Sequence, residues 1–242
     1  YTTEIKGDIL PGIEGILSKR SGSKEGQSGL WLVKSIDNAL LESREDRHSN
    51  NKEIFHPSSL GNPCDRYLYL HYHGLLIQKK IDAQLRRIFD HGSSAEYRYC
   101  KYFEKMRVLI GQEVQARIEY PPIHGRADFQ LFFQDYGHIL VELKTINDAG
   151  FKKLNEPQSS HRIQLQTYLN ILNIDTGIVL YENKNNQAIK VFQMKKSLED
   201  WGDILERCRI IQAMMSCPTL ASLKSDHDKY CQCLLVKDSL HV

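Results

Sequence analysis

The stretch from residue 124 to residue 144 constrains the fold of this chain more than any other, because two strand patterns flank a short polar turn. Phe129, Leu131 and Phe133 occupy alternate positions, and residues 139–143 are apolar apart from one carboxylate. Residues 135–138, Asp-Tyr-Gly-His, have the composition of a turn. This order predicts a β-hairpin.

Three charged residues lie in this hairpin, namely Asp128, Glu142 and Lys144. Alternate side chains of a strand face the same side, so Glu142 and Lys144 project together, and the hairpin can bring Asp128 close to both. Buried charges must be compensated, and a divalent cation compensates two carboxylates. Hard oxygen ligands suit Mg²⁺ or Mn²⁺. The pattern therefore indicates a Mg²⁺ or Mn²⁺ site whose lysine orients a water or stabilises charge on a phosphate.

A predicted helix over residues 162–172 follows, with apolar residues at helical spacing. Gln164 and Tyr168 are four residues apart, so they share one face of this helix. Taken alone, each motif has an ordinary alternative, a solvated hairpin in the first case and a polar helix face in the second.

Together the motifs resemble the PD-(D/E)XK nuclease superfamily, in particular its RecB-type branch, where a Q-x-x-x-Y helix follows the E-x-K strand. The resemblance implies a restriction-endonuclease-like α/β fold, a mixed central sheet flanked by helices. It implies that Asp128, Glu142 and the Leu143 carbonyl bind the metal and that Lys144 positions the attacking water. Gln164 and Tyr168 would hold the substrate backbone.

Further segments extend the resemblance over roughly residues 56–195. Gly92 and Glu96 match the Gly that precedes a His or Glu by four residues on the family's first core helix. The resemblance implies that Glu96 is a further metal ligand, and the alternative is an exposed helix residue. The branch more often has His there, so this chain resembles its phage-type recombination exonucleases. Residues 58–66, ending in Arg66, resemble a segment of RecB-like CRISPR-associated exonucleases. For contacts with DNA we expect Arg66, Arg126 and Lys184.

The expected order of core elements is helix, strand, strand, strand, helix, strand, strand, helix. The first helical part of this order consists of two predicted helices, over 75–89 and 95–109. Residues 1–55 do not match the nuclease pattern. They are expected to form an N-terminal extension with helices over 9–17 and 30–41 and a Gly/Ser-rich linker over 21–29. Residues 56–242 would form the nuclease domain.

Charge distribution is more informative than net charge, which is only +2. Basic residues gather around the expected Glu96 helix, where a stripe could hold phosphates or could equally be a solvated helix face. Its members are Lys79, Lys80, Arg86, Arg87, Arg98, Lys101, Lys105 and Arg107. No hydrophobic run approaches the length of a membrane span, and no signal peptide is recognised, so we expect a DNA-associated cytoplasmic protein without membrane contact.

The chain has six cysteines, which in a reducing compartment are expected to be free thiols. In many RecB-type nucleases, one cysteine before the core and three after it bind an iron–sulfur cluster. Cys64, Cys217, Cys231 and Cys233 have that arrangement, but without the usual C-x-x-C spacing. With His227 nearby, zinc is an alternative. Our expectation is that these cysteines are packing residues.

The function expected from these features is Mg²⁺- or Mn²⁺-dependent hydrolysis of DNA phosphodiesters, with an exonuclease preferred because the Q-x-x-x-Y branch is rich in them. Recombination, repair or the processing of phage or defence DNA would be the setting. Two alternatives stay open: a non-catalytic nucleic-acid-binding module, and a structural subunit of a recombination or defence complex. Residues 1–55 are the candidate surface for a protein partner.

Overall fold

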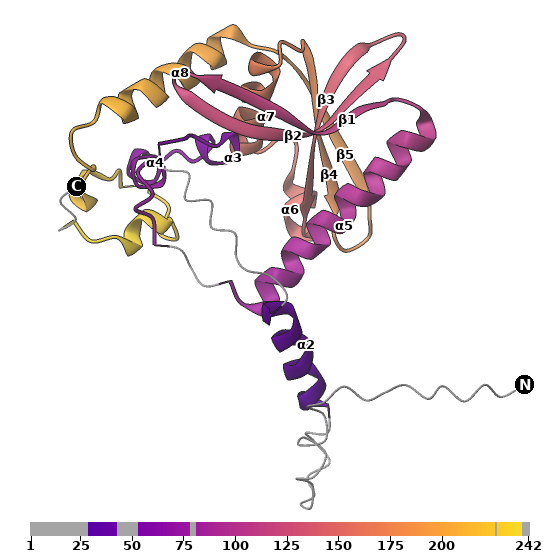
Figure 1. Cartoon of the computed structure of the whole chain (residues 1–242), viewed down its shortest axis with the longest axis horizontal. Coiled ribbons are helices and arrows are strands. Elements are labelled where there is room, and N and C mark those ends of the chain that lie inside the picture. Colours follow the sequence, from indigo (N-terminus) through magenta and orange to yellow (C-terminus); the bar gives the residue numbers. More distant parts are fainter. Residues whose placement is uncertain (1–28, 43–52, 78–80, 226, 239–242) are drawn as a thin grey trace, which may run out of the picture. The chain divides into compact units, whose positions relative to one another are not determined.

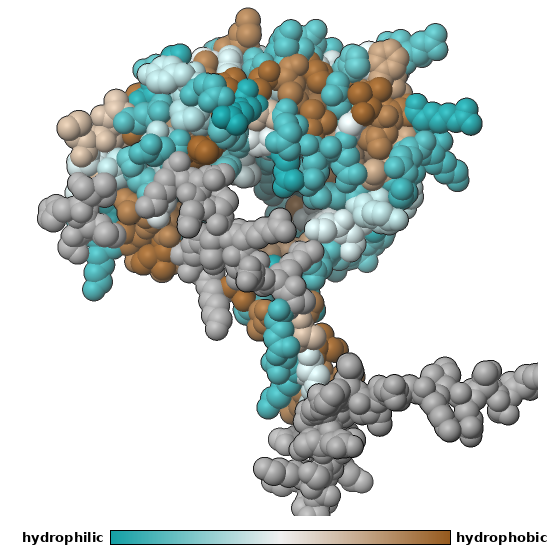
Figure 2. All heavy atoms as spheres, viewed as in Figure 1, coloured by the Kyte–Doolittle hydropathy of each residue, from teal (hydrophilic) through white to brown (hydrophobic). Residues whose placement is uncertain are grey.

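The protein is described by a computed structural model, which defines residues 29–42, 53–77, 81–225 and 227–238. The chain divides into two units, residues 1–45 and residues 46–242, and each is described by itself. Of the first unit only α2 (Leu30–Glu42) is defined. It agrees with the helix expected over 30–41, whereas the helix expected over 9–17 and the linker before residue 29 lie outside the described residues. None of the side chains of α2 is buried, and Figure 2 shows hydrophobic side chains on its surface.

The second unit is built on a five-stranded sheet with strand order β1-β2-β3-β4-β5 (Figure 1). Only β3 and β4 are parallel, and the other neighbours are antiparallel. The hairpin expected from the sequence is β2–β3, and Gly137 in its turn has a φ of 71°, a conformation that favours glycine. The strands are β1 (Leu109–Glu119), β2 (Pro122–Phe133), β3 (Gly137–Ile146), β4 (Thr176–Asn183) and β5 (Ile189–Lys195).

The described helices of this unit follow the expected order around the sheet. They are α3 (Pro57–Leu60), α4 (Asp65–Tyr72), α5 (Ala83–Met106), α6 (Asp148–Lys153), α7 (Ser159–Ile171) and α8 (Leu198–Ala213), with the short 3₁₀ helices η1 (Leu220–Ser222) and η2 (Gln232–Leu235) near the end. α8 begins at a serine cap, because the Ser197 side chain accepts a hydrogen bond from the Asp200 backbone N–H. No described helix is long and apolar enough to cross a membrane.

The helices α5 and α7 cover opposite faces of the sheet. In β3, Leu140 packs in a core with Leu165 and Leu169 of α7. The next residue, Val141, packs in a second core that includes Tyr99 of α5. This alternation places the even-numbered residues of β3 toward α7, which determines the face on which the charged residues of β3 lie.

The two helices predicted over 75–89 and 95–109 were wrong in their bounds. A single helix, α5, runs from Ala83 to Met106 with Gly92 in its interior, and residues 75–77 are not helical. A glycine inside a helix costs only about 1 kcal/mol relative to alanine, which the burial of Ala95, Tyr99 and Phe103 outweighs. The sequence also predicts a strand over 114–120, and this strand, β1, begins earlier, at Leu109.

A third core joins α4, α8 and the end of the chain. Leu68 and Tyr69 of α4, Ile211 of α8, and Cys233 of η2 are among its buried members. Phe55 also belongs to this core and pairs with Ile123 of β2 in an isolated β-bridge.

Candidate active site

Asp128 and Glu142 lie at the point where β2 and β3 separate. The pairing between the two strands runs from Phe133–Gly137 to Phe129–Val141 and stops there, so Asp128 and Glu142 are the first residues beyond it. The Asp128 carboxylate accepts a hydrogen bond from the Leu143 backbone N–H at 2.8 Å. This contact holds the Asp128 side chain in the space that opens between the strands.

Glu142 is the most constrained residue of the site, with 1% of its surface exposed. Its Oε1 accepts a hydrogen bond from Gln164 Nε2 at 2.7 Å and lies 2.8 Å from Lys144 Nζ. Its Oε2 is buried and has no hydrogen-bond partner among the described residues. A buried carboxylate oxygen without a partner is costly, so this atom marks the place where a cation would be stabilised.

The carboxylates of the site destabilise one another's charged forms. Burial and then the charge of Asp128 raise the pKa of Glu142 to about 8, even though Lys144 acts in the opposite direction. Burial also raises the pKa of Asp128. For Glu96 the causes are burial and then the charges of Asp128 and Glu113, and its pKa is raised too. A cation would stabilise the charged forms of these neighbouring carboxylates, and their oxygen donors fit Mg²⁺ or Mn²⁺.

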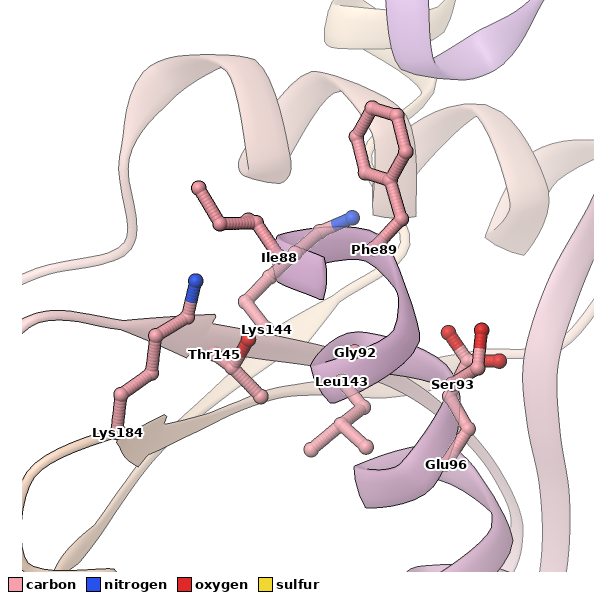
Figure 3. Close-up of a pocket in the computed structure, with 9 residues that line it drawn as sticks. All are labelled: Ile88, Phe89, Gly92, Ser93, Glu96, Leu143, Lys144, Thr145 and Lys184. Atoms are coloured by element: carbon pink, nitrogen blue, oxygen red, sulfur yellow. The ribbon is translucent and has the colours of Figure 1, made fainter. Parts of the chain in front are cut away.

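A pocket of about 390 Å³ adjoins these residues, between α5 and the ends of β3 and β4 (Figure 3). Lys144 and Lys184 line it together with Glu96 and Leu143, which is the residue expected to offer its carbonyl to the metal. Ile88 and Phe89 of α5 contribute an apolar edge. The pocket therefore combines two ammonium groups with a carboxylate.

The two residues of the Q-x-x-x-Y motif are buried beside Glu142 rather than exposed. Gln164 is 6% exposed and Tyr168 is 3% exposed. Burial and then the charge of Glu142 raise the pKa of Tyr168. Gly125 leaves room for the Tyr168 ring, because a Cβ at that position would lie 3.0 Å from the ring and 2.7 Å from Pro57. Gln164 thus orients a carboxylate of the site.

Two further residues, Glu113 and His161, lie near the site. Glu113 of β1 raises the pKa of both Asp128 and Glu96, and its carboxylate pairs with Arg126 Nη1 at 3.0 Å. His161, at the start of α7, is hydrogen-bonded to the Tyr181 hydroxyl at 2.7 Å. Burial and then the charge of Lys144 lower the pKa of His161 to about 4, so its ring is neutral at physiological pH. Glu113 belongs to no motif, so no sequence pattern would have singled it out, whereas His161 lies in the turn that the sequence predicts over 159–161, which could face substrate.

The expected DNA contacts lie in different environments. Arg126 is exposed and pairs with Glu113, and Lys184 lines the pocket. Arg66 is 2% exposed. Its guanidinium donates to backbone carbonyls of the C-terminal segment, residues 217–225 and 227–238, including that of Val236 at 2.6 Å. In this position Arg66 does not present its donors to a phosphate.

Two members of the basic stripe, Arg98 and Lys101, form ion pairs with glutamates of this chain. Arg98 donates to both carboxylate oxygens of the buried Glu182, at 2.5 and 2.7 Å. Lys101 pairs with Glu104 at 2.8 Å, and Lys79 and Lys80 lie outside the described residues. Arg98 is therefore bound to the sheet, which anchors α5 beside the carboxylates.

The cysteines form a group that differs from the expected one. Cys64, His227, Cys231 and Cys233 have their ligand atoms within 4.8 Å of one another. Cys217 is not a member, and its Sγ lies 3.5 Å from Arg66 Nη1. Of the four expected cluster ligands, the structure brings three together and adds His227.

Comparison with solved structures identifies similar folds at low sequence identity. The protein SSO0001 matches with a TM-score of 0.53 and 18% identity over 77% of this chain and 88% of that one. An alkaline exonuclease from Laribacter hongkongensis matches with a TM-score of 0.49 and 12% identity over 74% of this chain and 91% of that one. A phage-related exonuclease from Haemophilus somnus 129PT has a TM-score of 0.47 and 14% identity over 66% and 92%. No protein-family model and no curated protein sequence matches the chain.

The similarity to SSO0001 shows a shared fold. With its five-stranded mixed sheet between helices, the restriction-endonuclease-like α/β fold expected from the sequence is confirmed. The architecture therefore agrees with the one that the resemblance to the PD-(D/E)XK nucleases implies.

Proposed function

We propose that this protein is a Mg²⁺- or Mn²⁺-dependent deoxyribonuclease of the PD-(D/E)XK type that hydrolyses DNA phosphodiester bonds. The observation that carries the proposal is the convergence of Asp128, Glu142 and Lys144 where β2 and β3 separate, with Glu142 Oε2 buried and unpartnered among the described residues. As the RecB-type resemblance implies, we further propose that it degrades DNA from its ends.

The metal would be held by Asp128 and Glu142, with the Leu143 carbonyl and Glu96 completing the site. When bound, it would supply Lewis-acid polarisation of the phosphate and lower the pKa of a bound water. The ammonium of Lys144, 2.8 Å from Glu142, is placed to orient the attacking water and to stabilise negative charge developing on the phosphate.

The surrounding residues position this group and the substrate. Gln164 fixes the orientation of the Glu142 carboxylate through its hydrogen bond. Lys184 extends the positive charge of Lys144 along the pocket, where DNA phosphates would bind. Such contacts with the backbone carry no base information, so cleavage should not depend on sequence. The buried Arg66 has a structural role in this proposal.

Incubation of the purified chain with labelled linear and covalently closed circular DNA, with Mg²⁺, with Mn²⁺ and without added metal, tests the proposal. We expect cleavage of linear DNA only when a divalent cation is present. Asp128→Asn should abolish it, and Lys144→Ala should lower the rate by about a hundredfold or more while DNA affinity is retained.

Matched controls for these two variants are Asp175→Asn and Lys196→Ala, which remove members of a surface ion pair that the site does not use. Normal activity in Asp128→Asn would overturn the assignment of the site. Cleavage of closed circles would contradict the exonuclease, and DNA binding without cleavage in any metal would favour the non-catalytic binding module.

A further inference from the structure

Four potential metal ligands converge away from the carboxylate site, at the contact between α4 and the end of the chain. Cys64 precedes α4, whereas His227, Cys231 and Cys233 lie in the C-terminal segment. The Sγ atoms of Cys64 and Cys233 are 3.6 Å apart, and His227 Nε2 lies 3.1 Å from the first and 3.4 Å from the second. All four ligand atoms are within 4.8 Å of one another.

This arrangement does not fit the iron–sulfur cluster that the family resemblance implies. A four-iron cluster places a cube of iron and sulfide between its ligands, so four ligand atoms within 4.8 Å of one another leave no room for it. The fourth cysteine that such a cluster would need is also absent from the group. Cys217 lies beside Arg66, and a histidine takes its place.

The same distances fit a single tetrahedral ion. Zinc binds thiolate at about 2.3 Å and imidazole at about 2.0 Å, which places neighbouring ligand atoms about 3.5–3.8 Å apart. The observed separation of 3.6 Å between the Cys64 and Cys233 Sγ atoms needs almost no adjustment. A set of three thiolates and one imidazole also favours zinc over Mg²⁺ or Mn²⁺, which bind oxygen donors.

We propose that Cys64, His227, Cys231 and Cys233 form a mononuclear zinc site. Four protein ligands fill a tetrahedral ion, so no position is left for substrate, and the role of the site is structural. None of its ligands belongs to the carboxylate site, so the inference does not depend on the proposed function.

The site fastens the C-terminal segment to α4. Among its described residues, this segment has η1 and η2 as its only regular elements, so regular backbone hydrogen bonding contributes little to its stability. Arg66 of α4 supports the same contact, because it donates to the carbonyls of Pro218 and Val236 and pairs with Asp238 at 3.0 Å. A metal that binds only the folded arrangement would stabilise the docking of this segment.

The metal content of the full-length protein tests the proposal. Elemental analysis should give one zinc per chain and no stoichiometric iron, and the protein should be colourless. Replacement of zinc by Co²⁺ in the unaltered chain should produce the absorption of a tetrahedral cobalt–thiolate centre. This measurement needs no variant, so it tests for the zinc site even if the variants fail to fold.

Variants then identify the ligands. Cys233→Ser and His227→Ala should lose zinc, whereas the matched controls Cys217→Ser and Cys208→Ser should retain it. Removal of zinc with a chelator should make residues 227–238 accessible to proteases while the sheet stays protected.

Three results would overturn the proposal. Stoichiometric iron with sulfide would establish the cluster, and loss of zinc in Cys217→Ser would refute the ligand set. Metal-free protein that also fails to take up zinc or Co²⁺ under reducing conditions would show that these cysteines are packing residues.

Discussion

Replacement of Glu142 by glutamine should make the metal-free protein more stable while abolishing its activity. The carboxylate is 1% exposed and lies near Asp128, so its charged form is disfavoured in the folded state. Glutamine has nearly the same shape and is never charged. Its amide oxygen can keep the hydrogen bond from Gln164, so the substitution removes the charge and leaves the packing intact.

The magnitude follows from the pKa of Glu142, which is about 8 in the folded protein against an ordinary value of 4.5. At pH 7 the unfolded chain ionises this group and the folded chain largely does not. The difference of about 2.5 pH units between 4.5 and 7 corresponds to about 3 kcal/mol. Because the folded pKa is raised, the penalty is absent below about pH 4.5, grows by about 1.4 kcal/mol per pH unit, and levels off above about pH 8.

Urea unfolding of both proteins in Mg²⁺-depleted buffer, at several values between about pH 5 and about pH 8, measures this difference. Depletion by an ion-exchange resin is preferable to a strong chelator, which would also remove zinc from the C-terminal site. Addition of Mg²⁺ should then stabilise the parent protein and not the variant. A variant that is less stable than its parent at neutral pH, or a difference that does not change with pH, would refute the reasoning.

Three further predictions concern the surroundings of the site. Gln164→Ala should slow cleavage less than Glu142→Gln and equally for all DNA sequences, and a changed base preference in cleavage assays would show that α7 reads bases. Lys184→Ala should weaken DNA binding and lower the slope of log affinity against log salt by about 0.9 in titrations; an unchanged slope would exclude a phosphate contact. Arg98→Ala leaves the buried Glu182 without its ion-pair partner and should cost about 3 kcal/mol in urea unfolding, and a loss below about 1 kcal/mol would show that Glu182 is compensated otherwise.

The part of the site that the sequence made predictable is the part encoded by local periodicity. The alternation along β3 places Glu142 and Lys144 on one face, and the turn before it positions Asp128, so three residues within one hairpin were sufficient. The same holds for Gln164 and Tyr168, which are one helical turn apart.

Contacts between distant segments were not predictable in this way. Arg98, a member of the expected phosphate-binding stripe, donates to Glu182 instead. Arg66 is buried and donates to backbone carbonyls near the C-terminus. Cys217 is absent from the metal-ligand group for the same reason, whereas His227 is the additional ligand that the zinc alternative expected. Each depends on which side chains tertiary folding brings together, and a count of basic residues or cysteines contains no such information.

The turn between β2 and β3 has a consequence for how this protein tolerates change. Loop tips normally accept inserted residues, because they are exposed and pack against little. Here the pairing of Phe133 with Gly137 begins the ladder that ends one residue before Asp128 and Glu142. An insertion absorbed by a longer loop would leave the carboxylates in place. One that shifts β3 by a single residue would turn Glu142 and Lys144 toward α5 and bring Leu143 to the α7 face, so a fully folded protein could lose its site through a change at the opposite end of the hairpin.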